Sequence, residues 1–184
     1  KFALREKCLE KREIFFRKIG NECLKLKDIE LIILEIKSRL KISSIGIYHP
    51  IKSEISPLKI MDICKNFTIK ICLPVIDKNT DELIFSKFDT KMSITKNKYG
   101  IIEPNKIIQI TPDIIFVPMV GFDKNLNRLG YGKGYYDRTI SKLRKLKKIF
   151  VIGLAYDNQI VRNIPTEFHD EKMDIIITDK KIYR

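Results

Sequence analysis

The densest set of chemically useful residues is the stretch RLGYGKGYYDR at positions 128–138. Its alternating glycines, Gly130, Gly132 and Gly134, carry no Cβ, so the backbone there can approach a phosphate closely. Arg128 and Lys133 add positive charge beside them. A glycine-rich turn that leads into a helix also offers unpaired N–H groups and the positive end of the helix dipole. The stretch therefore predicts a phosphate-binding site.

The spacing matches neither of two common nucleotide-binding motifs. No Ser or Thr follows the Gly-Lys pair, as a Walker A loop requires, and Tyr135 occupies the third glycine position of a dinucleotide fingerprint. Taken alone, the stretch is also compatible with a simple strand-to-helix connection whose tyrosines lie at the edge of the core.

Apolar runs around this stretch predict the elements that position it. Three runs of strand length suit strands buried on both faces, and they are found at 113–119, 148–156 and 173–179. The segment 134–148 between the first two is an amphipathic helix. Strand, glycine-rich loop, helix and strand form a βαβ unit, in which ligands bind at the carboxyl ends of strands. We therefore predict a Rossmann-like, three-layer α/β/α sandwich with a mostly parallel central sheet.

The N-terminal half predicts further helices and strands. Helical spacing predicts a first helix that ends at Gly20, and a second from Asp28, as N-cap, to Leu40. The second helix is expected to bury Leu31, Ile32, Leu34 and Ile36. The other expected features are strands at 42–49, 68–76 and 82–88, a short helix at 56–67 started by Ser56 and Pro57, and turns around Tyr99-Gly100 and Glu103-Pro104. No linker divides the chain, so residues 1–184 are expected to form a single domain.

Composition narrows the function classes. The 36 basic and 23 acidic residues give a net charge of +13, which suits an anionic partner. The lysines form no single block, however, and a general abundance of Lys explains the charge better. The four cysteines, Cys8, Cys23, Cys64 and Cys72, form no Cys-x-x-Cys pair and predict free thiols in a reducing compartment. No apolar run approaches the ~20 residues of a membrane span. We expect a cytoplasmic protein with no membrane partner.

The longer string GFDKNLNRLGYGKGYYDR, residues 121–138, resembles the signature of the 5-formyltetrahydrofolate cyclo-ligases, also called methenyltetrahydrofolate synthetases. Other segments resemble that family in the same order: KFALR (1–5), YHPIKSEISPL (48–58), GIIEP (100–104) and the segment 153–178. The resemblance covers nearly the entire chain. There are departures, because Leu126 stands where a turn glycine is usual, Met119 replaces a frequent glycine, and Ser56 replaces an acidic residue of a folate-contacting element.

The resemblance assigns most of the motif to ATP. Lys1 and Arg5 lie one helical turn apart and would reach the ATP phosphates from the first helix. The residues that would wrap ATP are Arg128, Leu129, Gly130, Tyr131, Gly132, Lys133, Gly134, Tyr135 and Tyr136. Among them, Arg128, Lys133 and Tyr135 are the candidates for a direct part in the reaction.

Folate and metal sites are implied in the same way. The formyl group would be bordered by Tyr131, Gly132, Lys133, Gly134 and Tyr135, with Tyr48 and Glu54 as further folate candidates. Asp137 and Asp170 would hold Mg2+, which prefers carboxylate oxygens together with phosphates and water. From the residues alone, Asp137 is equally explained as an acid at a helix start and Asp170 as a loop acid. His169 is expected to have a supporting role in a loop rather than that of a general base.

The resemblance implies a monomeric enzyme that converts ATP and 5-formyltetrahydrofolate into ADP, phosphate and 5,10-methenyltetrahydrofolate. Two other functions stay open. A nucleic-acid-binding protein would show a basic stripe with interleaved aromatics, but the sequence has no RNP-like strand and no helix-turn-helix, so no specific nucleic acid is expected. A sugar-phosphate isomerase would need no ATP, and it is suggested by fold analogy alone.

Overall fold

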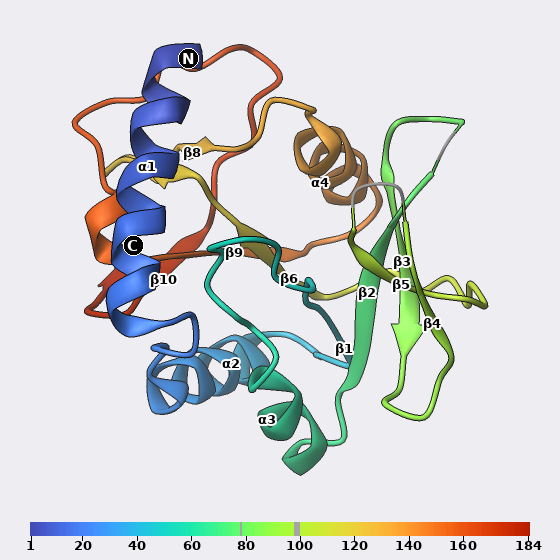
Figure 1. The fold of residues 1–184 in the computed structure, drawn as a ribbon. Helices are drawn as coiled ribbons and strands as arrows, with labels where there is room; N and C mark the ends of the chain where they lie inside the picture. The colour runs from blue at the N-terminus through green and yellow to red at the C-terminus, as the bar shows by residue number, and fades with distance from the viewer. Residues whose placement is uncertain (78, 98–99) are drawn as a thin grey trace.

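A seven-stranded sheet forms the centre of the protein (Figure 1). The computed structural model describes residues 1–77, 79–97 and 100–184. In spatial order the strands are β11 (Ile182–Tyr183), β10 (Ile175–Thr178), β9 (Phe150–Ala155), β6 (Ile114–Pro118), β1 (Ser44–Gly46), β2 (Lys70–Ile76) and β3 (Leu83–Phe88). The pairings from β10 to β2 are parallel, and β11 and β3 pair antiparallel at the two edges. The mostly parallel sheet predicted from the sequence is confirmed.

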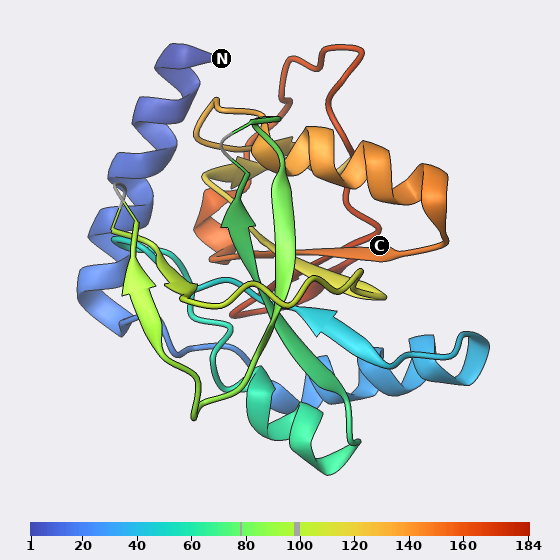
Figure 2. The same cartoon turned by 90° about the vertical axis from the view of Figure 1, so that its right-hand side faces the viewer.

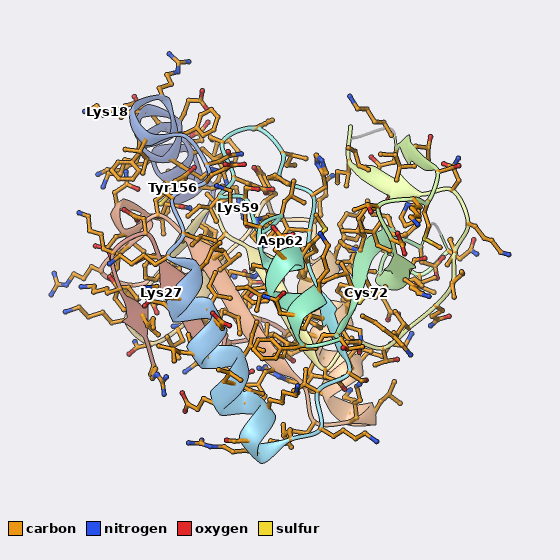
Figure 3. All side chains as sticks on the ribbon, turned by 90° about the horizontal axis from the view of Figure 1, so that it is seen from below. Lys18, Lys27, Lys59, Asp62, Cys72 and Tyr156 are labelled. Carbon is orange, nitrogen blue, oxygen red and sulfur yellow. The ribbon has the colours of Figure 1, made fainter. Side chains whose placement is uncertain are left out.

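Helices cover both faces of this sheet. Helices α2 (Leu26–Arg39) and α3 (Ile60–Asn66) lie side by side below it, and α4 (Tyr135–Leu146) lies above it in the same view (Figures 1 and 3). Successive residues of β6 alternate between the two layers, because Phe116 packs in the cluster of α2 and α3 whereas Ile115 packs in the cluster of α4. Such two-sided burial is typical of parallel sheets, and it confirms the three-layer α/β/α architecture.

Helix α1 (Phe2–Ile19) packs across the loops that follow β6 and β9. It contacts the short strand β7 (Gly121–Phe122) and the 3-10 turn η1 (Asp157–Gln159). Cys8 is buried against Val120, Leu129 and Ile164, and Phe15 meets Tyr156 edge to face at 5.3 Å. The helix ends where predicted, at Gly20, whose φ of 72° suits glycine. These contacts place α1 at the carboxyl ends of the central strands.

Several short elements were not predicted. Strand β7 pairs with β8 (Arg128–Leu129), so the glycine-rich motif begins on a strand. Strands β4 (Ile94–Lys96) and β5 (Ile102–Pro104) form a second hairpin, and β11 was also missed. The expected turn at Glu103-Pro104 is wrong, because both residues belong to β5. The other expected turn, at Tyr99-Gly100, includes Tyr99, which lies outside the described residues. Strands of two or three residues are too short for a hydrophobic period to show.

Two predicted helices differ in their details. Helix α2 begins at Leu26 and has Lys25, not Asp28, as N-cap. Leu31 and Leu34, predicted to be buried, are 64% and 40% exposed. The buried residues are Ile29, Ile32, Ile33 and Ile36, and their spacing of i, i+3, i+4 and i+7 is that of a single helical stripe.

The third helix and the first strand are shorter than predicted. Helix α3 begins at Ile60 rather than Ser56, since Leu58 and Lys59 form a turn first and the Ser56 N–H donates to the Asn21 carbonyl at 2.7 Å. Strand β1 spans three residues rather than the eight of 42–49. Among the described residues, no helix is both long and apolar enough to cross a bilayer. The four cysteines are free, as predicted, and Cys72 lies within β2 (Figure 3).

Gly46 lets β1 pass under the ring of Phe85. Phe85 belongs to β3, the strand that crosses beside β2 in Figure 2. A Cβ at position 46 would lie 2.7 Å from a ring carbon of Phe85. We expect Gly46→Ala to lower the free energy of unfolding by about 1–3 kcal/mol, the usual cost of overpacking a core. Urea unfolding measures it. In a Phe85→Leu background, where the outer ring carbons are gone, the same substitution should cost clearly less. An equal cost in both backgrounds would contradict this account.

Candidate active site

The glycine-rich loop joins β8 to α4 and owes its shape to its glycines. Gly132 has a φ of 93°, and Gly134, the N-cap of α4, has a φ of 69°. L side chains rarely adopt such angles. A Cβ would also meet the Arg5 guanidinium at 3.1 Å from position 132, and that of Arg138 at 2.7 Å from position 134. The loop therefore brings bare backbone to the start of a helix, as the sequence predicted.

Arg128 and Asp137 form an ion pair at the base of this loop. The Arg128 Nη2 donates to Asp137 Oδ2 at 2.7 Å, and the two side chains are 6% and 15% exposed. The guanidinium also lies 5.6 Å from the centre of the Tyr136 ring. The side chain of Arg128, a candidate for contact with ATP, is thus largely withdrawn from water. Its removal would leave a largely buried carboxylate without its cation, which is costly for folding.

Helix α1 contributes two of the predicted cations. Lys1 Nζ lies 2.5 Å from Asp170 Oδ2 and 3.0 Å from Glu167 Oε1, and the Arg5 Nε donates to the Gly130 carbonyl at 2.7 Å. Burial disfavours the charged form of Asp170, but the hydrogen bonds from Lys1 and from the Glu167 N–H, together with the charge of Lys1, outweigh it, and the pKa of Asp170 is lowered. The N-terminus of α1 is thereby attached to both the glycine-rich loop and the 163–173 loop.

The two predicted metal ligands lie on neighbouring segments. The backbone N–H of Glu171, which follows Asp170, donates to Asp137 Oδ1 at 3.4 Å. Each carboxylate is balanced by a cation, Arg128 for Asp137 and Lys1 for Asp170. In the described part of the chain, no group of three or more His, Cys, Asp or Glu side chains could hold a metal. Two carboxylates nonetheless fit Mg2+ that completes its coordination with phosphates and water.

The remaining loop residues differ in accessibility. Lys133 is exposed, and Tyr131 is 37% exposed. The Tyr135 ring centre lies 5.6 Å from the Arg138 guanidinium. Leu129 is buried in the core beneath α1, so its side chain cannot face a nucleotide.

His169 lies on the surface, with Nε2 3.3 Å from Glu167 Oε2. Together with Asp137 it lines a hollow of about 370 Å3 beside α4. It lies in a loop, as expected, and its supporting role stays a prediction.

The two folate candidates, Tyr48 and Glu54, are both buried. The Tyr48 hydroxyl donates to the Ile55 carbonyl at 2.7 Å, and its ring packs in the core shared by α2 and α3. Glu54 Oε2 accepts from the Ile51 N–H at 2.9 Å, and the Tyr131 hydroxyl also hydrogen-bonds its carboxylate. Burial raises the pKa of Glu54 to about 7. The structure thus brings Glu54 to the glycine-rich loop, whereas Tyr48 is held within the core.

Arg12 is a residue of this site that the sequence analysis did not assign. It is 1% exposed, and its guanidinium donates to Ser53 Oγ, to the Met119 carbonyl and to the Tyr131 hydroxyl. A signal was present in the sequence, because Arg12 falls at helical spacing with apolar residues of α1. A charged residue on an apolar stripe has to find buried partners.

The arrangement can do a definite kind of chemistry. Bare backbone at a helix start, flanked by cations from α1 and β8, suits the phosphates of a nucleotide. A buried carboxyl with a pKa near neutrality lies next to it and can exchange a proton.

Comparison with known proteins gives the family. The model of the 5-formyltetrahydrofolate cyclo-ligase family matches residues 1–179. The chain belongs to this family. The family predicted from the sequence, and the ligase class that its name states, are confirmed.

Curated relatives and solved structures agree with this assignment. The chain is 34% identical over 151 residues to the 5-formyltetrahydrofolate cyclo-ligase of Haemophilus influenzae, covering 78% of this chain and 80% of the relative. A probable cyclo-ligase of Schizosaccharomyces pombe is 40% identical over 116 residues, covering 55% and 57%. The solved 5,10-methenyltetrahydrofolate synthetase of Mycoplasma pneumoniae superposes with a TM-score of 0.68 at 30% identity, covering 97% and 98%, and that of Aquifex aeolicus with 0.70 at 28%, covering 99% and 91%.

Glu54 should give this cyclo-ligase family member an unusual pH dependence of stability. Its pKa rises from 4.5 to about 7 on folding. The native state therefore keeps a proton that the unfolded state releases, and the free energy of unfolding falls as pH rises from 4.5 to 7. The upper limit of this loss is about 3 kcal/mol. Glu54→Gln should remove this pH dependence. The variant should therefore gain stability relative to the parent as pH rises over that window.

Urea unfolding at several pH values between 4.5 and 8 measures this difference. Glu10→Gln, on the exposed side of α1, is the matched control and should keep the pH dependence of the parent. Parallel curves for Glu54→Gln and the parent would show that the carboxyl is not perturbed.

Proposed function

We propose that this protein catalyses the ATP- and Mg2+-dependent cyclisation of 5-formyltetrahydrofolate to 5,10-methenyltetrahydrofolate, with release of ADP and phosphate. One observation carries the proposal: in a chain of this family, Arg5 and Arg128 meet at a glycine-rich loop at the start of a helix, and Lys1 pairs with Asp170 on the neighbouring loop. We further propose that the enzyme works as a monomer in the cytoplasm, with no membrane or specific nucleic-acid partner.

The nucleotide side of the site would be served by backbone and cations. The N–H groups at the start of α4 and the exposed Lys133 can meet the phosphates, and Lys1 and Arg5 can reach them from α1. Asp137 and Asp170 would hold Mg2+, which neutralises phosphate charge when it is bound. In this role the cations that now balance the two carboxylates would balance the phosphates as well.

The chemical steps follow from the substrate. The formyl oxygen is a poor leaving group, so the γ-phosphoryl group would move from ATP onto it. N10 then attacks the formyl carbon and gives up its proton to a base or to water, and the carbon–oxygen bond breaks as phosphate leaves. The protein contributes position and charge stabilisation, as is usual in phosphoryl transfer. Glu54, with a pKa of about 7, can hold or release a proton beside the substrate near neutral pH.

An absorbance assay for 5,10-methenyltetrahydrofolate tests the proposed function. The purified protein is incubated with 5-formyltetrahydrofolate, with and without ATP and Mg2+. We expect product only when both are present, because the formyl oxygen has to be phosphorylated first. Product without ATP, or none with it, would overturn the proposal. Lys133→Ala should raise the KM for ATP, and Lys27→Ala on α2 (Figure 3) is the exposed control that should not.

The metal assignment makes a separate prediction. Asp137→Asn and Asp170→Asn should each raise the Mg2+ concentration needed for half-maximal activity and lower turnover, since each removes one hard oxygen charge. Asp62→Asn on α3 (Figure 3), whose side chain is 72% exposed, is the control. A Mg2+ titration of activity measures the effect. If both variants overlay the parent curve, these two carboxylates do not hold the metal.

A further inference from the structure

Arg12 connects α1 to three separate segments of the site. Its Nε donates to Ser53 Oγ at 3.2 Å, its Nη1 to the Met119 carbonyl at 3.1 Å, and its Nη2 to the Tyr131 hydroxyl at 2.5 Å. The three partners follow β1, β6 and β8. Because the side chain is 1% exposed, water cannot replace these acceptors. The geometry of all three segments is therefore tied to one guanidinium.

The connection continues from Tyr131 to Glu54. The Tyr131 hydroxyl accepts a hydrogen from Arg12, and its own hydrogen is donated to the Glu54 carboxylate. Arg12, Tyr131 and Glu54 thus form a chain of hydrogen bonds from α1, through the glycine-rich loop, to the segment that follows β1. Burial raises the pKa of Glu54, and the charge of Arg12 and the bond from Tyr131 both oppose that rise.

We propose that Arg12 is a positioning residue, which fixes Tyr131 and Glu54 against each other on the folate side of the site. The proposal rests on the proposed function, because that function places folate at these two residues. The nucleotide side has its own anchors, since Lys1 holds Asp170 and Arg5 holds Gly130. The guanidinium of Arg12 donates to three separate loop segments, which favours a role in orientation.

The surroundings of Glu54 fix the direction of the expected pH effect. The charged and titratable groups that face it are Arg12 from α1, Lys52 from its own loop, Tyr131 from the glycine-rich loop, Tyr48 after β1 and Tyr136 from α4. Arg12 and Lys52 are the cations in this set. Loss of the Arg12 charge removes one of the two cations that favour the carboxylate, so the Glu54 carboxyl should titrate at a higher pH.

The test compares Arg12→Gln and Arg12→Lys with Arg17→Gln. Arg17 lies on the same helix, is 75% exposed and pairs only with Glu13 in the described structure. For Arg12→Gln we expect the KM for 5-formyltetrahydrofolate to rise about tenfold or more, as for a lost hydrogen bond to a charged group, with a much smaller change in the KM for ATP. The midpoint of the change in kcat/KM near pH 7 should move up by about one unit. Arg12→Lys, which keeps the charge, should restore the midpoint in part, and Arg17→Gln should match the parent.

Two outcomes would overturn the proposal: equal rises in both KM values, or an unmoved midpoint in Arg12→Gln. If that variant does not fold, Tyr131→Phe decides, because it removes only the hydroxyl between Arg12 and Glu54. It should reproduce the folate-specific KM effect and the upward shift, and a parent-like profile would refute the role.

A carboxyl titration of Glu54 by 13C NMR, in parent and variants, needs no activity. If the parent lacked cyclo-ligase activity, the proposed function would fail, and this titration would still decide whether Arg12 controls Glu54.

Discussion

A buried guanidinium must be given hydrogen-bond acceptors, and this requirement fixes where α1 lies. Arg12 finds its acceptors where the segments after β1, β6 and β8 meet, so the helix cannot slide or turn without leaving a buried charge unpaired. Residues 1, 5 and 12 share one face of an α-helix. The same constraint therefore directs Lys1 and Arg5 to the loops at which the proposed nucleotide site lies.

The site also depends on charges that neutralise one another. Arg128 with Asp137, and Lys1 with Asp170, are partly or largely withdrawn from water, where an unpaired charge is costly. In the proposed reaction, phosphates and Mg2+ would bring a second set of opposite charges to the same side chains. Because the cations and carboxylates of the site already balance each other, binding phosphates together with Mg2+ would change the net charge of the site little.

Leu126 shows how the fold tolerates a departure from the family signature. It stands where a turn glycine is usual, and its φ is 63°, in the left-handed region that glycine favours. The tight turn, closed by the Leu126 N–H to the Asp123 carbonyl at 3.1 Å, explains the usual glycine. The leucine costs about 1–2 kcal/mol in this conformation, but its side chain packs against the core under α4, which offsets that cost.

The sequence by itself determined the long buried strands, the amphipathic helix α4, the glycine-rich loop and the family, because these depend on local patterns of apolar residues, glycines and motif spacing. It also identified Arg5, Arg128 and Asp137 as candidate residues of the site. Only the tertiary structure decided the partners: that Arg128 is buried on Asp137, that Tyr48 belongs to the core, and that Leu31 and Leu34 face solvent. It also decided the burial and the hydrogen-bond partners of Arg12 and Glu54. Burial and the pKa of a side chain depend on segments far away in the sequence, which meet only when the sheet and α1 are assembled.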